Sequence, residues 1–312
     1  MMPAHLDSRL RELFGERVQR DAPLAALTTF KVGGNADWLL TLQTPAELQQ
    51  AVLLARDAAV PITIIGGGSN VLISDAGVRG LVVKLRGGNV VRLPSGHVRA
   101  DAAVTINGLV RWTINRGLAG VEAWAGTPGT VGGAIYGNAH FQGRNIGELI
   151  DQVQLVDENA NVIDVSASDM EFGYDFSRLH RTREFVVSAD FHAAHGEPDA
   201  LRTIARQSLA FRKSTQPLES ASAGCIFQNP DRSRDNVPAG IPASAGALVD
   251  RAGLKGSAEG KARVSARHAN FIVNEGGSTA AEIRTLIDRC KREVRDRFGV
   301  ELREEIVCVG FE

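Results

Sequence analysis

Apolar and polar residues follow one another in short runs whose period changes several times along the chain. Residues 6–19 are typical of a short helix, and a second helix is predicted after Thr44, where Thr-Pro-Ala-Glu supplies a capping threonine, a proline at the first helical position and a glutamate that closes a capping box. Further helices are predicted over 105–116 and 198–213. A last helix is predicted to open with the capping box at Thr279.

Short apolar runs between these helices indicate strands. They cover residues 36–42, 60–65, 81–85, 98–102, 153–157, 162–165, 185–191 and 306–309. The runs 153–157 and 162–165 flank a Glu-Asn-Ala-Asn turn and are typical of a hairpin. Helices and strands mix without strict βαβ alternation, and several strands pair locally. The pattern therefore predicts the α+β class and not a doubly wound parallel sheet.

A domain boundary is expected where the polar segment 195–198 interrupts regular structure. It divides the chain into 1–195, with a further split near residue 87, and 196–312. In the second part, residues 214–246 are rich in Ser, Pro, Gly and Ala and show little periodicity. An irregular segment of this length in a compact domain is usually functional.

Two glycine-rich loops carry the first chemical signal. Gly66-Gly67-Gly68-Ser69-Asn70 follows the apolar run 60–65, and a second loop covers residues 126–134. Glycine has no Cβ, so its N–H groups can approach and cradle an anion. The first loop lacks both G-x-x-x-x-G-K-[ST] and the G-x-G-x-x-G spacing. Two such loops favour a long phosphate-bearing ligand held at two places, with ordinary tight turns as the alternative.

Composition narrows the classes of partner. The chain has 312 residues, 44% of them hydrophobic, and a net charge of -1, which gives no general attraction to nucleic acid or membrane. No signal-peptide segment and no apolar run of the ~20 residues needed to cross a bilayer is seen. The three cysteines are odd in number and lack metal-ligand spacing, so a cytoplasmic, reduced protein without a metal site is expected.

Several longer motifs occur in one order along the chain. They are Phe30–Gly34, Gly66–Leu72, Gly129–Ala134, Ser222–Pro230, Ala245–Asp250, Gly253–Gly256, Val264–Asn274 and Leu302–Ile306. In this order they resemble the UDP-N-acetylenolpyruvoylglucosamine reductase (MurB) family. The resemblance implies an FAD-binding region of the vanillyl-alcohol-oxidase (PCMH) type, followed by a substrate-binding α/β domain.

The resemblance also implies an activity. Members of this family reduce the enolpyruvyl ether of UDP-N-acetylglucosamine to UDP-N-acetylmuramate, a peptidoglycan precursor, with NADPH as electron donor and FAD as carrier. The expected partners are UDP-GlcNAc-enolpyruvate and NADPH, and the expected state is a monomer or weak oligomer.

Binding residues follow from the matching positions. The expected FAD contacts are Gly66, Gly67, Gly68, Ser69, Asn70, Thr127, Gly129, Thr130, Gly132, Gly133 and Asn138. The expected substrate contacts are Asn229, His268, Arg212 and Lys213, the last two through the UDP phosphates.

The catalytic residues must stabilise negative charge beside a carboxylate and deliver a proton to carbon. The position of the family's proton-donating serine is Cys225, and an unperturbed thiol, with a pKa near ~8.5, is a stronger acid than a hydroxyl. The family's carboxylate matches Glu305, which would need a raised pKa to act as an acid. Cys290 and Cys308 lie in regular apolar patterns typical of buried structural thiols.

One catalytic position departs from the family. Asp175 stands where the Tyr-Arg-x-Ser pattern has arginine, and an aspartate cannot stabilise an enolate. Arg178, three residues on, is predicted to supply the missing guanidinium, with Asp175 holding its rotamer. His140 and Arg144 lie near the cofactor or substrate by position, and neither is given a role.

Two other readings stay open. The chain could be an FAD oxidoreductase of the same superfamily with another substrate. It could also be a flavin- or UDP-sugar-binding protein whose Asp175 marks lost catalysis.

Overall fold

The computed structural model describes residues 3–311, and the chain forms two compact units. Unit 1 contains the N-terminal residues up to Ala22, Ala36–Gly67 and Arg79–Phe211, and unit 2 contains Pro23–Asn35, Gly68–Val78 and the residues from Arg212 onwards. Each unit therefore gathers segments that are far apart in the sequence. The predicted boundary near residue 195, between an FAD-binding part and a substrate-binding part, stays a prediction.

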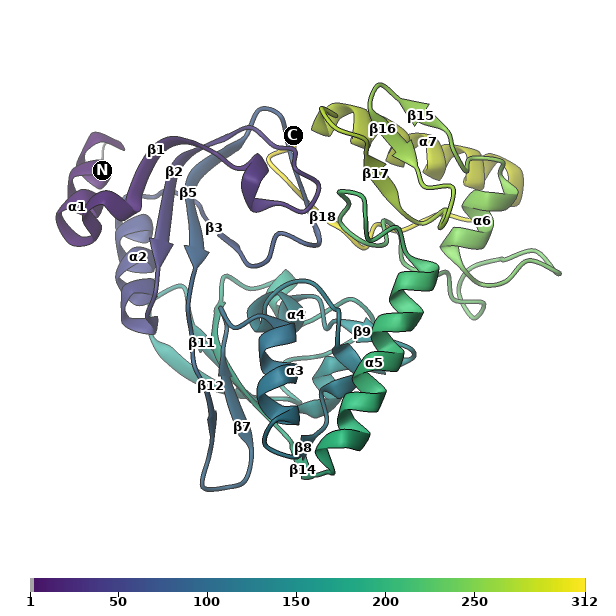
Figure 1. Cartoon of the computed structure of the whole chain (residues 1–312). Helices are drawn as coiled ribbons and strands as arrows, with labels where there is room; N and C mark the ends of the chain where they lie inside the picture. Colours follow the sequence, from purple (N-terminus) through teal and green to yellow (C-terminus); the bar gives the residue numbers. More distant parts are fainter. Residues whose placement is uncertain (1–2, 312) are drawn as a thin grey trace. The chain divides into compact units, whose positions relative to one another are not determined.

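Unit 1 is built around a five-stranded antiparallel sheet in the order β12-β11-β13-β7-β6 (Figure 1). Its strands are β6 (Val90–Arg92), β7 (Val98–Asp101), β11 (Ile150–Val156), β12 (Val162–Ser166) and β13 (Phe185–Phe191). Helices α3 (Ile106–Ile114) and α4 (Val131–Tyr136) pack on it, and Leu109 and Ile135 join one core with Val98 and Val153.

A second sheet in unit 1 has the order β1-β2-β5-β3. It consists of β1 (Val18–Pro23), β2 (Asn35–Leu42), β5 (Val78–Leu85) and β3 (Ile62–Ile65), and β3 and β5 run parallel. Helices α1 (Pro3–Phe14) and α2 (Pro45–Asp57) contribute Leu10, Leu48 and Val52 to its core. The long helix α5 (Pro198–Thr215) runs to the end of this unit and into the next.

Unit 2 packs α6 (Ala245–Arg251) and α7 (Ala280–Phe298) with the small antiparallel sheet β15-β16-β17 (Figure 1). The strands of this sheet are β15 (Ala258–Glu259), β16 (Ala262–Val264) and β17 (Ile272–Asn274). A separate parallel pair joins β4 (Val71–Ile73) to β18 (Val307–Val309). Residues from all three segments of the unit, among them Phe30, Leu72 and Leu286, share one core.

Shorter elements connect these parts. They are the two-residue strands β8 (Leu118–Ala119), β9 (His140–Phe141), β10 (Arg144–Asn145) and β14 (Ala194–His195), and the 3-10 turns Gly15–Arg17, Ala25–Leu27, Glu122–Trp124, Ile146–Leu149 and Arg178–His180. No helix of the described residues is long and apolar enough to span a membrane.

The α+β class and the predicted helix ends with clear capping signals are confirmed. Thr44 and Thr279 both form complete capping boxes, and Gly299 ends α7 in the left-handed conformation. The hairpin pairs Val153 with Val165. The helix predicted over 6–19 is wrong at its end, because the chain enters β1 at Val18, where pairing with another strand overrides local propensity.

Candidate functional site

The two glycine loops of unit 1 lie in direct contact. A Cβ on Gly67 would stand 2.5 Å from the Cα of Gly129, and one on Gly66 would stand 2.6 Å from Oγ1 of Thr130. Real Cβ atoms do not approach other atoms this closely, so the glycines are needed for the two backbones to meet. The two loops are therefore neighbours in space, and their joint contact with one ligand stays a prediction.

The second loop is fixed by hydrogen bonds to Asn107 of α3 and by one within the loop itself. Asn107 accepts a hydrogen bond from the N–H of Gly126 at 2.7 Å and donates one to the carbonyl of Thr127 at 3.2 Å. Thr130 caps α4 by accepting from the N–H of Gly133. These contacts fix the loop without any ligand.

The first loop keeps its donors available. Among the hydrogen bonds of residues 3–311, none is donated by the backbone N–H of Gly66, Gly67 or Gly68. The carbonyl of Gly66 accepts a hydrogen bond from Nζ of Lys84, whose pKa is lowered chiefly by burial. Free N–H groups on a fixed loop suit an anionic group such as a pyrophosphate. These residues fit the FAD that the sequence predicts.

The end of the first loop belongs to unit 2 and is anchored there. Gly68 has a φ of +66°, and a Cβ on it would stand 2.0 Å from the carbonyl oxygen of Leu27. Asn70 donates its side-chain amide to the carbonyl of Glu305 at 3.1 Å, and its own carbonyl accepts from the N–H of Val307 at 2.9 Å. The loop is therefore tied to the segment that contains Glu305 and leads into β18.

Cys225 and Glu305 are brought together by backbone pairing within unit 2. The N–H of Glu305 donates to the carbonyl of Ile226 at 2.8 Å, and the N–H of Gln228 donates to the carbonyl of Arg303 at 2.9 Å. Cys225 and Glu305 are both partly exposed. The two predicted catalytic groups, 80 positions apart in the sequence, thus lie on neighbouring strand-like segments.

Asn270 fixes this pairing from the other side. Its Nδ2 donates to the carbonyl of Phe227 at 2.8 Å, its Oδ1 accepts from the N–H of Phe227 at 2.9 Å, and its carbonyl accepts from the N–H of Ile226. The side chain is buried. Sequence analysis gave Asn270 no role, although it lies inside one of the motifs that carry the resemblance.

The predicted substrate residues have different surroundings. Arg212 is only 6% exposed, and burial lowers its pKa to about 10 while a negative charge on Cys225 would raise it. Burial, with a further contribution from Lys255, lowers the pKa of His268 and favours the neutral ring. Asn229 Oδ1 accepts from the N–H of Ala245 at 3.1 Å, whereas Lys213 is exposed. Arg212 is thus a buried cation within electrostatic range of the predicted proton donor.

Asp175 pairs with a histidine. Its Oδ1 lies 2.9 Å from Nδ1 of His140, and its side chain is only 7% exposed. Asp175 sits at the tip of a tight turn between Gly173 and Phe176, with a φ of +51° that aspartate tolerates better than most residues. Its Oδ2 is buried and has no hydrogen-bond partner among the described residues.

Two further hydrogen bonds join the Asp175 turn to the segment that follows α4. Asn138 donates to the carbonyl of Gly173 at 2.7 Å, and Ser177 donates to the carbonyl of Tyr136 at 2.7 Å. Oδ1 of Asn138 also accepts from the N–H of Gly147, so both ends of its side chain take part in holding this arrangement. Asn138 therefore positions the segment, and a direct contact with FAD stays a prediction.

Arg178 makes different contacts from those expected. Its Nε donates to Oε2 of Glu184 at 2.8 Å, and its Nη2 donates to Oε1 of the same carboxylate. Burial alone would raise the pKa of Glu184, but the hydrogen bonds from Arg178 and Thr182 outweigh this effect, and the pKa is lowered. The predicted hydrogen bond between Asp175 and Arg178 is wrong, because each residue has its own partner: His140 and Glu184.

The remaining acids and thiols near Glu305 have structural environments. Glu304 accepts hydrogen bonds from Arg284 and Lys291, which outweigh the effect of burial and lower its pKa to about 2. Burial raises the pKa of Cys290 to about 12 and that of Cys308 to about 11. Glu304, Cys290 and Cys308 thus have structural surroundings, and the roles of Cys225 and Glu305 stay predictions.

Comparisons with known protein families agree with this division. Residues 36–166 match the model of an FAD binding domain. Residues 216–309 match the model of the UDP-N-acetylenolpyruvoylglucosamine reductase C-terminal domain. The first range contains both glycine loops, and the second contains Cys225 and Glu305.

Similar proteins carry the same name over almost the whole chain. UDP-N-acetylenolpyruvoylglucosamine reductase of Heliobacterium modesticaldum is 36% identical over 301 residues, which cover 96% of this chain and 93% of that protein. Its counterpart from Synechococcus sp. WH7803 is 38% identical, with 95% and 94% covered. The crystal structure of the Thermus caldophilus reductase (MurB) superposes with a TM-score of 0.78 at 29% identity, covering 94% of this chain and 99% of that one.

Identity above 30% over nearly the full length, with both halves matched in order, defines the relationship. The chain belongs to the UDP-N-acetylenolpyruvoylglucosamine reductase (MurB) family.

Proposed function

We propose that this protein reduces the enolpyruvyl group of UDP-N-acetylglucosamine enolpyruvate to give UDP-N-acetylmuramate, with NADPH as the electron donor. In this reaction a hydride and a proton add across the carbon–carbon double bond, and NADPH becomes NADP⁺. FAD, when bound, carries the hydride from one substrate to the other. The observation that carries the proposal is the backbone pairing of Ile226 with Glu305, in a chain of this family.

FAD is assigned to the glycine loops. Gly66 and Gly67, whose N–H groups donate no hydrogen bond among the described residues, lie against the backbone of Gly129 and the side chain of Thr130. Gly132, Gly133, Thr127 and Thr130 complete the loop, and Ser69 follows Gly68 on the other. This supports the proposal that the loops hold the pyrophosphate and the groups beside it.

Proton delivery is assigned to Cys225, and charge stabilisation to Glu305. Addition of hydride leaves negative charge on the carbon next to the substrate carboxylate, which a protonated Glu305 would stabilise by donating a hydrogen bond. Cys225 would then give its proton to that carbon. A buried Arg212 is suited to pair with an anionic group of the substrate, because a desolvated guanidinium gains most from a bidentate anion.

The role of the family's missing arginine is assigned to His140 in preference to Arg178. Nε and Nη2 of Arg178 are both used by Glu184, whereas the His140 ring is oriented through Nδ1 by Asp175 and has Nε2 as a second group for hydrogen bonding. The segment of His140 directly continues the glycine loop and α4. Arg178 remains the alternative that sequence spacing suggested.

The biological setting follows from the reaction. UDP-N-acetylmuramate is a peptidoglycan precursor, so the protein would act in cell wall biogenesis and thereby in cell shape and division. Both proposed substrates are soluble cytoplasmic metabolites, which is why we place the enzyme in the cytoplasm. A monomer or weak oligomer is proposed.

The test is NADPH oxidation by the purified yellow protein, followed with UDP-GlcNAc-enolpyruvate and, as control, with UDP-GlcNAc. The proposal requires oxidation that depends on the enolpyruvyl group and yields UDP-N-acetylmuramate in equal amount. Oxidation that is equally fast without it would favour another flavin oxidoreductase, and a bound flavin with no turnover would favour a binding protein.

A further inference from the structure

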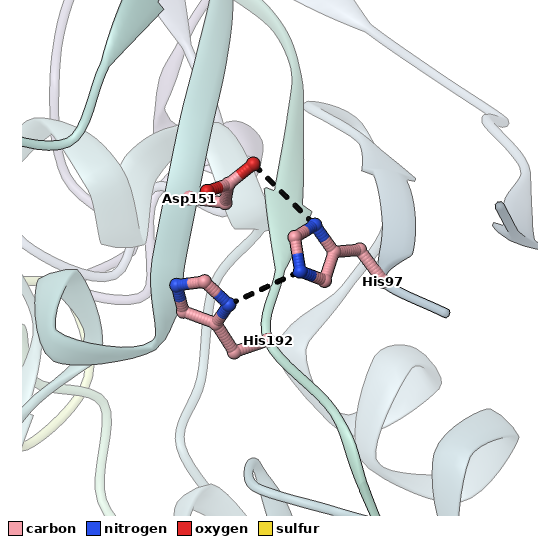
Figure 2. A group of neighbouring side chains, drawn as sticks. All are labelled: His97, Asp151 and His192. Carbon is pink, nitrogen blue, oxygen red and sulfur yellow. Dashed lines mark hydrogen bonds and ion pairs between the residues drawn. The ribbon is translucent and has the colours of Figure 1, made fainter. Parts of the chain in front are cut away.

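Three neighbouring strands of unit 1 place three metal-ligating side chains together. His97 precedes β7, His192 follows β13, and Asp151 is the second residue of β11; these strands are adjacent in the sheet. Figure 2 shows the His97 ring between the Asp151 carboxylate and the His192 ring. Because the residues are so far apart in sequence, no local motif announces them, and the sequence predicts no metal site.

Strand register explains why the side chains share one face. β13 and β7 pair Phe191 with Val98, and both of these residues are buried. Side chains alternate along a strand, so the next residues, His192 and His97, lie opposite one another and point away from the core.

A β-bulge brings the carboxylate to the same place. The pairing of β11 with β13 shifts between Ile150 and Gln152, which leaves Asp151 as the extra residue. Bulges re-aim a side chain in this way. The bulge therefore brings a third ligand beside the two histidines.

The distances are those of ligands around a single ion. Nδ1 of His97 lies 3.4 Å from Oδ2 of Asp151, and Nε2 of His97 lies 3.3 Å from Nδ1 of His192. One donor atom from each residue can be chosen so that all three lie within 4.8 Å of one another. Two ligands at tetrahedral positions on Zn²⁺ are about 3.4 Å apart, given bonds of about 2.0–2.1 Å. The two contacts use opposite nitrogens of the His97 ring, so the ion would take one of them, and the imidazole rings would have to reorient for all three residues to hold it.

The chemistry selects the class of ion. A nitrogen–nitrogen contact between two imidazoles needs at least one ring nitrogen without a proton, and such a lone pair is what a metal binds. Two imidazoles and one carboxylate suit Zn²⁺ and similar divalent transition metals, whereas Mg²⁺ and Ca²⁺ prefer oxygen ligands. The side chains of His97 and Asp151 are 27% and 45% exposed, so water can complete the coordination.

Arg99, a cation close to His97 in the sequence, already has a carboxylate partner. Arg99, two residues after His97, donates to both carboxylate oxygens of Asp190 at 2.6 and 2.7 Å. Its charge is compensated by a buried partner. Asp151 is therefore available to an ion.

We propose that His97, Asp151 and His192 form a binding site for one divalent transition metal ion of the Zn²⁺ class, separate from the site of the reductase reaction. Bound there, the ion would cross-link the ends of β7, β11 and β13. The alternative is a hydrogen-bonded surface cluster that takes no ion.

Calorimetric titration with ZnCl₂ tests the proposal on the FAD-loaded protein, prepared without a histidine tag and treated with EDTA. We expect one equivalent of Zn²⁺ to bind, affinity to fall by about tenfold or more in His97→Ala and His192→Ala, and MgCl₂ to give no binding. The matched control is His195→Ala, an exposed histidine of the same unit outside the cluster, which should bind like the wild type.

Two results would overturn the proposal: no stoichiometric uptake of Zn²⁺, or uptake that persists in both histidine variants and so belongs to other groups such as the thiols. Asp151→Asn provides a check that preserves shape, because the amide lacks the charge of the carboxylate. It should also weaken binding while leaving the circular dichroism spectrum unchanged, and unaltered binding would count against the site.

Discussion

His140 and Asp175 form a pair in which Nδ1 of the imidazole lies 2.9 Å from Oδ1 of a nearly buried carboxylate. Asp175 stands at the sequence position at which the family pattern has an arginine. An aspartate alone offers no group that stabilises an enolate, whereas an imidazole oriented by that aspartate has a second ring nitrogen that can donate a hydrogen bond to it. On the function proposed above, the pair would make Asp175 compatible with catalysis.

The first prediction concerns the imidazole of His140. His140→Ala should lower kcat by about 10²-fold, the usual cost of losing one group that stabilises developing negative charge. Flavin reduction by NADPH should continue, because His140 is needed only in the second half-reaction, in which the enolpyruvyl group is reduced. Anaerobic stopped-flow spectroscopy separates the two half-reactions.

The Arg178→Ala variant distinguishes His140 from Arg178 as the residue that replaces the family's arginine. If His140 carries the role, Arg178→Ala should mainly reduce stability, by about 1–3 kcal/mol, since it leaves the carboxylate of Glu184 without its partner. A collapse of kcat in Arg178→Ala with normal turnover in His140→Ala would establish Arg178 instead. Arg181→Ala, which removes a neighbouring exposed arginine, controls for general changes in charge.

The second prediction concerns the proton donor. Cys225→Ala should lower kcat by about 10²–10⁴-fold, the range for loss of a general acid, while NADPH still reduces the flavin. Cys225→Ser should retain part of the activity, because a hydroxyl can also give a proton. Cys308→Ala is the matched control, since the Cys308 thiol has a pKa raised to about 11 by burial. Full turnover in Cys225→Ala would refute the assignment.

The third prediction concerns the contact of the glycine loops. Gly67→Ala would place a Cβ 2.5 Å from the Cα of Gly129 and force the backbones apart. A cost of about 1–3 kcal/mol is typical of such overpacking, or about 5- to 150-fold in the Kd for FAD. Fluorescence titration of the apoprotein measures it. Gly137→Ala, whose new Cβ would be 3.9 Å from its nearest neighbour, should bind FAD normally.

The fourth prediction concerns pH and stability. The pKa of Glu304 is about 2 in the folded protein, below the ~4.3 of an unfolded chain. The ionised side chain therefore stabilises the fold above pH ~4.3, and this contribution disappears as the pH falls toward 2. Glu304→Gln should lower the free energy of unfolding by on the order of 2–3 kcal/mol at pH 7 and make it less dependent on pH in the acid range.

Urea denaturation at several pH values checks this expectation. Glu301→Gln is the control, because the Glu301 side chain is 66% exposed and its carboxylate comes no closer than 4.0 Å to Nε of Arg295. Equal stability of Glu304→Gln and the wild type at pH 7 would show that the Arg284–Glu304–Lys291 cluster contributes nothing measurable.

Local signals in the sequence predicted local structure well. The capping boxes at Thr44 and Thr279 depend on four consecutive residues, and the hairpin at 153–165 depends on one turn. These features need no knowledge of the remaining chain. The close contact of the glycine loops was not predicted, because nothing in either loop alone indicates which backbone it meets.

Features that depend on distant residues could not be predicted. The parallel pairing of β4 with β18 joins residues more than 200 positions apart and assigns the end of the glycine loop to unit 2. Likewise, sequence spacing placed Arg178 beside Asp175, whereas tertiary packing gave these residues separate partners. The role of Asn270 became visible only once both of its hydrogen bonds to Phe227 were seen.

The central claim is that this chain is an active reductase although Asp175 stands at the arginine position. The most direct measurement is a single turnover: protein reduced anaerobically with one equivalent of NADPH is mixed with UDP-GlcNAc-enolpyruvate, and the flavin absorbance is followed. An active reductase should show rapid reoxidation of the flavin, with one equivalent of UDP-N-acetylmuramate formed. A flavin that binds and is reduced, yet is not reoxidised by this substrate, would contradict it.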